Sequence, residues 1–269
     1  MTSAMSDTTP TPPLGATSAR KAAHVVLHAV LQFDEEDSQV RFDECARRLI
    51  LIKHRQFVAL SPNPKLPPLV VESNGKVENV RFSLNHRFVA VQRSDTVIDF
   101  MDLHANTSFS HTCKGGGSRG RWRILSYHWT GTPVADFVVI TTAGVEFYIV
   151  LPDKSALKLV KAIALTVAWS IYSHTTRLLL LATGPQDNVM HGVQIQPATL
   201  VRLPKFEIQL APHEVASSGP YGQPKLRRSL LPNDVSVARL YESIFCVHVE
   251  PERQQIFLYQ LFKDFVIRK

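Results

Sequence analysis

The stretch that decides the fold is Val77–Leu103, which reads VENVRFSLNHRFVAVQRSDTVIDFMDL. Apolar and polar residues alternate on either side of a continuously apolar segment, Phe88–Val91, and the polar pairs Asn85-His86 and Ser94-Asp95 supply turns between them. This pattern predicts three short antiparallel strands in one meander. The middle strand is apolar on both faces, so it needs protein above and below it. A similar unit must therefore stack on each side.

The same order of strand, turn, buried strand, turn and strand recurs along the chain. Phe82 follows Phe42 by 40 residues, and Tyr172 follows Trp129 by 43 residues. The strands predicted for the other copies are 40–43, 49–52 and 57–60; 124–129, 137–140 and 145–150; 167–172, 178–181 and 193–195; and 235–240, 244–249 and 256–259. Periods of about 40 to 45 residues with several strands each are typical of a β-propeller. We therefore predict an all-β, WD40-like β-propeller with about five blades' worth of repeats, which need not close a complete ring.

The segments between the copies predict further strands and two long loops. Leu157–Val160 and Phe206–Leu210 follow third strands and are predicted as fourth strands. Residues 113–121, rich in Gly and basic residues, and 211–233, rich in Pro, Gly and Ser, are predicted as exposed loops.

The chain divides into a tail and one domain. Residues 1–22 are rich in Thr, Ser, Pro and Ala and are predicted as a disordered tail, and 23–269 as the propeller domain. His24–Phe33 fits a strand or a short helical segment, and its β-branched residues favour a strand.

Composition limits the class of protein. The formal net charge of +7 and a pI near 9.4 permit an acidic partner, but the basic residues form small separate groups. These groups do not alternate with exposed aromatic residues along one element, which argues against a nucleic-acid partner. The three cysteines, Cys45, Cys113 and Cys246, lie far apart and favour a reducing compartment. The longest nearly uncharged apolar run, 162–171, falls short of the about 20 residues that span a bilayer, so we expect a soluble chain.

No motif predicts catalysis or a cofactor. Residues 115–120 match G-x-G-x-x-G, but a strand rather than a phosphate-binding helix is predicted after them. His24 and His28 are four residues apart without carboxylate ligands nearby, and there is no G-x-S-x-G elbow and no Cys/His pair in a recognisable setting. We therefore expect no enzyme activity, no metal and no cofactor.

Three separate segments resemble one known family, the regulators of the Mon/Ccz complex, also called Mic or Bulli. The resemblance lies in 80–84 with 90–93 and 99–100, in 144–148 with 150–154 and 157–159, and in 203–210, and runs in order from about Leu31 to Leu261. It implies the N-terminal propeller of a non-catalytic subunit of the exchange complex for the late-endosomal Rab GTPase, Rab-seven. Mon and Ccz homologues would be the partners, and the protein would be cytosolic and peripheral on late endosomes and lysosomes, supporting endosome maturation, lysosomal fusion and autophagy.

The chain departs from that family pattern in two respects. Family members continue into more propeller strands and a helical C-terminal region, whereas this sequence ends at Lys269, so we expect either a fragment or a ring that closes differently. The two long loops also differ from the family pattern.

Two groups of residues are candidates for contact with partners. In 203–210, Phe206, Ile208 and Leu210 are expected to pack on the blade, which leaves Lys205, Glu207 and Gln209 outward as a candidate interface. The second group is Lys225, Arg227 and Arg228, whose paired arginines invite comparison with phosphoinositide-binding propellers, although Ser229 stands where those proteins have Gly. Binding of a membrane through this basic loop is the alternative function.

Overall fold

A computed structural model describes residues 39–113, 122–210 and 229–269, apart from 54, 62, 64, 66, 73, 74 and 251–253. The chain divides into two units, Met1–Asp34 and Glu35–Lys269, and the described residues all belong to the second. The predicted tail 1–22 and the predicted strand 24–33 lie outside the described residues, as do 114–121 and 211–228. Among the described residues, no helix is long and apolar enough to cross a membrane.

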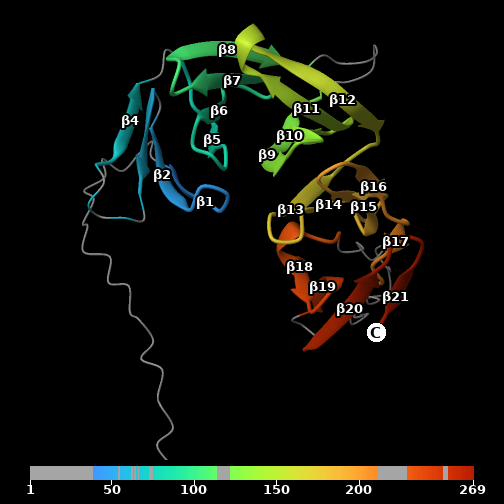
Figure 1. Ribbon diagram of the computed structural model, residues 1–269. Coiled ribbons are helices and arrows are strands. Elements are labelled where there is room, and N and C mark those ends of the chain that lie inside the picture. The colour runs from blue at the N-terminus through green and yellow to red at the C-terminus, as the bar shows by residue number, and fades with distance from the viewer. Residues whose placement is uncertain are drawn as a thin grey trace, which may run out of the picture. The chain divides into compact units, whose positions relative to one another are not determined.

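The second unit consists of five antiparallel sheets that follow one another in chain order (Figure 1). Their strands are β1 (Gln39–Asp43), β2 (Arg48–Lys53), β3 (Gln56–Leu60) and β4 (Leu69–Glu72); β5 (Asn79–Phe82), β6 (Phe88–Gln92), β7 (Val97–Asp102) and β8 (Thr107–Thr112); β9 (Ile124–Thr132), β10 (Ala135–Thr141), β11 (Gly144–Leu151) and β12 (Ala156–Ala164); β13 (Trp169–Ser173), β14 (Leu178–Thr183), β15 (Val189–Ile195), β16 (Leu200–Arg202) and β17 (Phe206–Glu207); and β18 (Val235–Leu240), β19 (Ser243–Glu250), β20 (Gln255–Leu261) and β21 (Val266–Arg268). Two short 3₁₀ turns, Pro152–Lys154 and Pro232–Asp234, complete the described elements. The all-β prediction and the repeated unit are confirmed.

The opening stretch forms β5, β6 and β7 as predicted. All five residues of β6 are buried, while β5 and β7 alternate between buried and partly exposed residues. The β5–β6 turn is held by Ser83, whose hydroxyl oxygen accepts a hydrogen bond from the amide of Phe88 at 2.9 Å. His86 in this turn has a φ of 57°, in the left-handed region that few residues other than Gly adopt. Polar turn residues thus set the register that directs the apolar side chains of β6 inward.

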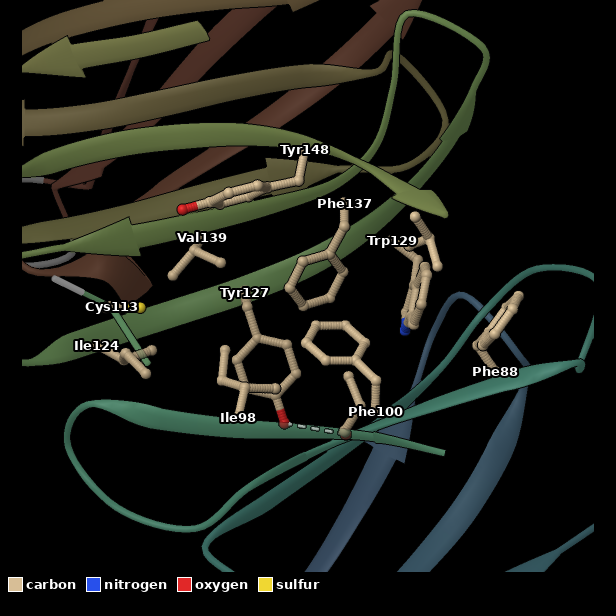
Figure 2. Close-up of a cluster of buried hydrophobic side chains, with 12 residues drawn as sticks. Phe88, Ile98, Phe100, Cys113, Ile124, Tyr127, Trp129, Phe137, Val139 and Tyr148 are labelled. Carbon is tan, nitrogen blue, oxygen red and sulfur yellow. Dashed lines mark hydrogen bonds between the residues drawn. The ribbon is translucent and has the colours of Figure 1, made fainter. Parts of the chain in front are cut away.

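Four apolar cores lie between successive sheets. Phe57 and Phe82 meet edge to face at 6.2 Å in the first core, between the β1–β4 and β5–β8 sheets. The second core, drawn in Figure 2, gathers aromatic rings from the β5–β8 and β9–β12 sheets, among them Phe100 and Phe137, whose centroids are 4.9 Å apart. The third and fourth cores join the β9–β12, β13–β17 and β18–β21 sheets in the same way. The apolar faces of the buried strands, such as β6, are therefore covered by a neighbouring sheet.

Side-chain hydrogen bonds also cross between sheets. The indole nitrogen Nε1 of Trp129 donates to the carbonyl oxygen of Arg81 at 3.0 Å. The hydroxyl of Tyr127 donates to the carbonyl oxygen of Ala90 at 3.3 Å. Trp129 and Tyr127 lie on β9, and both acceptors lie on the preceding sheet. These bonds satisfy the polar atoms of two buried aromatic residues and fix one sheet against the next.

The prediction for the fourth strands is only partly right. Leu157–Val160 lies within β12, as expected. Phe206–Leu210 does not form a full strand: β16 occupies the fourth position first, and β17 then adds a two-residue pairing with Val189 and Met190 of β15. Pro204 separates β16 from β17, and since proline has no N–H to donate, it interrupts a continuous ladder there.

Candidate interaction surface

The segment 203–210 lies along the β13–β17 and β18–β21 sheets. Ile208 is fully buried, and the ring of Phe206 packs on that of Tyr259 at 5.4 Å. Lys205, Glu207 and Gln209 alternate with these residues and are exposed. The predicted orientation of all three outward side chains is confirmed.

Two of the three outward residues also make intramolecular hydrogen bonds, Glu207 within its own sheet and Gln209 to the β18–β21 sheet. Asn188 donates through Nδ2 to Oε1 of Glu207 and to the carbonyl oxygen of Ile208, both at 3.0 Å. Gln209 accepts a hydrogen bond from the guanidinium of Arg268 on β21. Lys205 makes no hydrogen bond or ion pair with the described residues and keeps its charge available to a partner. The role of these residues in an interface stays a prediction.

The second predicted group, Lys225, Arg227 and Arg228, lies outside the described residues, as does the Gly-rich segment 115–120. The structure does confirm that the element after the Gly-rich segment is a strand, β9, and not the helix that a phosphate-binding loop needs.

An apolar sheet face that the sequence did not single out lies on the β18–β21 sheet. The pairing register places Val249 opposite Ile256 and Gln260 opposite Ile267, so that these side chains share one face with Leu258. The four apolar side chains among them, Val249, Ile256, Leu258 and Ile267, have exposures from 37% for Leu258 to 64% for Ile256. The opposite face carries Cys246 and Tyr259 and packs in the fourth core, so both faces of this sheet are apolar. The sequence does carry a sign of this face: apolar and polar residues alternate only weakly in 244–249 and 256–259, so apolar side chains fall on both faces of these strands.

A hollow of about 460 Å³ lies between the β5–β6 turn and the β9–β10 hairpin. Phe88 and Trp129 contribute apolar walls, and Arg87 and Asp136 are its charged lining residues. Both charges have intramolecular partners. Arg87 binds Asp102, while Asp136 accepts a hydrogen bond from the amide of Val150 at 2.9 Å.

The carboxyl of Asp136 has a raised pKa because burial disfavours its charged form, an effect that the Val150 bond opposes. The hydroxyl groups of the lining residues Ser83 and Thr132 donate to Oδ1 of Asn85 and to the carbonyl oxygen of Ala135.

One set of possible metal ligands occurs among the described residues. It comprises His111, Cys113 and Glu146, whose donor atoms lie within 4.8 Å of one another. These three residues form neither a cysteine pair nor a histidine pair in the sequence, and they were not predicted as a site. His111 and Cys113 are two residues apart, but the strand β8 that turns their side chains to the same side was not among the predicted strands.

Solved structures show which fold this is. The chain matches the β-propeller domain of Cps50 (Swd1) from Myceliophteria thermophila with a TM-score of 0.51 and 11% identity, over 85% of this chain and 71% of that one. It matches the WD40 domain of SCAP from fission yeast with a TM-score of 0.50 and 9% identity, over 87% of this chain and 55% of that one. At such low identity the likeness shows the fold alone, and that fold is the predicted WD40-like β-propeller.

Sequence comparison shows the family. The N-terminal region of the regulator of MON1-CCZ1 complex matches residues 40–157, which hold β1 to the start of β12. The human regulator of MON1-CCZ1 complex is 30% identical over 213 residues, 77% of this chain and 30% of that protein. The Dictyostelium discoideum homologue is 26% identical over 239 residues, 86% of this chain and 22% of that protein. The chain thus spans less than a third of the length of these relatives. Through its propeller strands the chain belongs to the regulator of MON1-CCZ1 complex family, as the sequence predicted.

Proposed function

We propose that this chain is a non-catalytic scaffold subunit of a Mon/Ccz guanine-nucleotide exchange complex that acts on a late-endosomal Rab GTPase. The observation that carries the proposal is the family match over 40–157 together with relatives named as regulators of that complex. Mon and Ccz homologues would then be the direct partners, and the Rab GTPase an indirect one. The complex would support endosome maturation, lysosomal fusion and autophagy.

The described structure is consistent with a platform. Stacked sheets with four apolar cores give a rigid body, and hydrogen bonds such as that from Trp129 to Arg81 hold adjacent sheets in register. The charged lining residues of the hollow between the β5–β6 turn and the β9–β10 hairpin already have intramolecular partners. We therefore assign the chain a role in binding and positioning, and assign nucleotide exchange to the partners.

The contact surface that we propose is the edge that bears Lys205, Glu207 and Gln209. Charged groups at the rim of an interface steer and orient a partner. Lys205 is the residue of choice for a test because its side chain has no ion pair to lose within the described residues. Changes at Glu207 or Gln209 would also disturb the bonds to Asn188 and Arg268.

The proposal is tested by co-purification. The tagged chain, expressed in its own cells, should retain the Mon and Ccz homologues. Lys205→Glu should weaken that retention, while Lys263→Glu, a change at another exposed lysine, should not. Failure of both homologues to co-purify with the unaltered chain would overturn the function. Equal retention by both variants would overturn only the proposed contact edge.

A nucleotide-exchange assay separates a scaffold from a catalyst. The chain alone should leave release of labelled nucleotide from the Rab GTPase at its spontaneous rate. Added to the purified Mon–Ccz pair on vesicles, it should change the rate of release. Acceleration by the chain alone would contradict a non-catalytic role.

The location that goes with this function is the cytosol, with peripheral attachment to late endosomes and lysosomes. The positive net charge favours an alternative route to the membrane, direct binding of phosphoinositides by Lys225, Arg227 and Arg228. Vesicle flotation of the isolated chain distinguishes the routes. A lipid-binding protein floats unaided and loses flotation when Arg227 and Arg228 are changed to Ala, whereas a scaffold recruited by its partners floats only in their presence.

A further inference from the structure

The three donors His111, Cys113 and Glu146 come from two adjacent sheets. His111 lies on β8, the outermost strand of its sheet, and Cys113 follows the end of that strand. Two residues apart in an extended chain, their side chains point to the same side. Glu146 lies on β11 of the next sheet. The donor atoms of all three residues lie within 4.8 Å of one another, so the site bridges the two sheets.

The backbone around each donor is fixed by regular pairing. His111 lies opposite Ile98 of β7, and the amide of Cys113 donates to the carbonyl oxygen of Thr96 at 2.9 Å. Glu146 sits in the interior of its sheet, opposite Val139 of β10 on one side. The donors therefore stand on sheet strands or immediately beyond one, as a preorganised site requires.

A neighbouring tyrosine orients the carboxylate and packs on the imidazole. The hydroxyl of Tyr148 donates to Oε2 of Glu146 at 2.6 Å, which leaves Oε1 for another partner. The ring of Tyr148 meets that of His111 edge to face at 4.9 Å. Figure 2 draws Tyr148 and Cys113 on the same side of the aromatic core, away from Phe88. Such outer contacts are what hold metal ligands in orientation in known sites.

The charged neighbour that acts on the Cys113 thiol is the carboxylate of Glu146. Cys113 is only 6% exposed and belongs to the apolar core. Burial raises the pKa of its thiol to about 12, and the negative charge of Glu146 adds to that rise. A divalent cation would offset both effects, because a coordinated thiol loses its proton outright.

We propose that His111, Cys113 and Glu146 bind one zinc ion between the β5–β8 and β9–β12 sheets. Imidazole, thiolate and carboxylate are the three ligand types that zinc takes in proteins, and three of them leave a fourth position for water or a partner's side chain. Tetrahedral zinc with bond lengths of about 2.0–2.3 Å holds its ligands about 3.5 Å apart. The donors lie within 4.8 Å of one another and would have to close to that spacing on binding. Binding would release the thiol proton and tie β8 to β11.

The test uses the whole chain, treated with a chelator and titrated with Zn²⁺ by calorimetry. We expect one equivalent to bind, with proton release that depends on the buffer. Cys113→Ser and Glu146→Gln should each weaken binding about 10-fold or more. Cys246→Ser is the matched control, because Cys246 is also a buried thiol but lies in the fourth core. Tyr148→Phe should retain binding with reduced affinity, as expected of a positioning residue.

Cobalt substitution identifies the thiolate ligand. Co²⁺ added in place of zinc should give a sulfur-to-metal charge-transfer band that Cys113→Ser abolishes and Cys246→Ser retains. Zinc should also raise the melting temperature of the unaltered chain but not that of Cys113→Ser, and the metal-free melting curves show whether the variants are folded. The proposal is overturned if the chain takes up no zinc, or if the charge-transfer band persists in Cys113→Ser.

Discussion

Asp43 and Phe82 are joined by a hydrogen bond between two sheets: the backbone amide of Phe82 donates to Oδ2 of Asp43 at 2.7 Å. Asp43 ends β1 and is 2% exposed. Its other oxygen, Oδ1, accepts from the amides of Cys45 and Ala46 in the β1–β2 turn, at 3.1 and 3.4 Å. One carboxylate therefore closes the turn of its own sheet and attaches the first strand of the next.

Replacing Asp43 by Ala should destabilise the chain by about 2 to 4 kcal/mol. Hydrogen bonds to a charged group contribute about 1.5–3 kcal/mol each, and their effects at one site do not add fully. Asp43→Asn, which keeps one acceptor oxygen, should lose less. Urea unfolding followed by circular dichroism measures both, with Asp264→Ala at an exposed site as the control. Equal stability of Asp43→Ala and the control would contradict the bridging role.

Truncating Phe100 should cost about 3–5 kcal/mol, the usual range for a buried phenylalanine changed to Ala. Phe100 is fully buried, and its ring lies 5.0 Å from that of Phe109 and 6.0 Å from that of Trp129. Tyr241→Ala removes an aromatic ring that is 90% exposed and should leave stability nearly unchanged. Thermal unfolding compares the two variants. A similar small effect from both would show that this core is not tightly packed.

Much of the fold could be predicted because the buried middle strands carry an unmistakable pattern. Phe88–Val91 is apolar on both faces, and such a run between polar turns has few other structures open to it. The outermost strands could not be predicted as well. β8 and β4 are largely exposed, and neither carries a buried apolar run like that of β6. Their position comes from pairing with β7 and β3, which is a tertiary effect.

The candidate functional residues were likewise predictable only where their position depends on local sequence. The alternation in 203–210 predicted which side chains face outward, since that depends only on local periodicity. The grouping of His111 and Cys113 with Glu146 depends on how two sheets pack and could not be read from residues that are 35 and 33 positions apart. Pro204 was visible in the sequence, and its lack of an N–H should have predicted the break between β16 and β17.

Changing Ile256 and Leu258 together to Thr should reduce self-association of the chain. Both side chains are exposed on the apolar face of the β18–β21 sheet, and Thr keeps a high preference for strands while adding a hydroxyl. Sedimentation velocity over a range of concentrations measures the effect. Phe257→Thr is the matched control on the same strand: its side chain packs in the fourth core, so this change should lower stability instead. Unchanged sedimentation of the double variant would show that this face does not mediate self-association.

The ion pair of Arg87 and Asp102 should contribute to resistance against acid. Arg87 donates through Nε and Nη2 to Oδ2 of Asp102 at 2.9 and 2.7 Å. These bonds are the main cause that lowers the pKa of Asp102 to about 2, against a burial effect in the opposite direction. A carboxyl with a lowered pKa contributes stability that is present above about pH 4 and is lost as the pH falls toward 2.

Arg87→Gln should therefore shift the midpoint of acid unfolding to higher pH. Circular dichroism between pH 5 and 2 follows the transition, and Arg239→Gln, on an exposed arginine of β18, serves as the control. Identical acid midpoints for the two variants would show that the pair does not matter for stability.

His128 should make the chain less stable in mildly acidic solution. It is 8% exposed, and its ring lies 5.0 Å from that of Tyr172 and 6.3 Å from that of His174. Burial first, and then the positive charge of Arg81, lower its pKa well below the ordinary value of 6.5.

The sign of the pH dependence follows from where the proton binds. In the unfolded chain His128 takes up a proton below about pH 6.5, while in the folded chain it stays neutral, so the unfolded state binds more protons and folding stability falls as the pH drops. His128→Phe removes this contribution and should flatten the decline in unfolding free energy between pH 7 and 5, measured by urea unfolding at each pH. His174 has a lowered pKa for the same reason and should keep part of the slope in that variant. The control is His104→Phe at an exposed position, which should leave the pH dependence of the unfolding free energy unchanged. If His128→Phe also leaves that dependence unchanged, His128 is hydrated and charged in the folded protein.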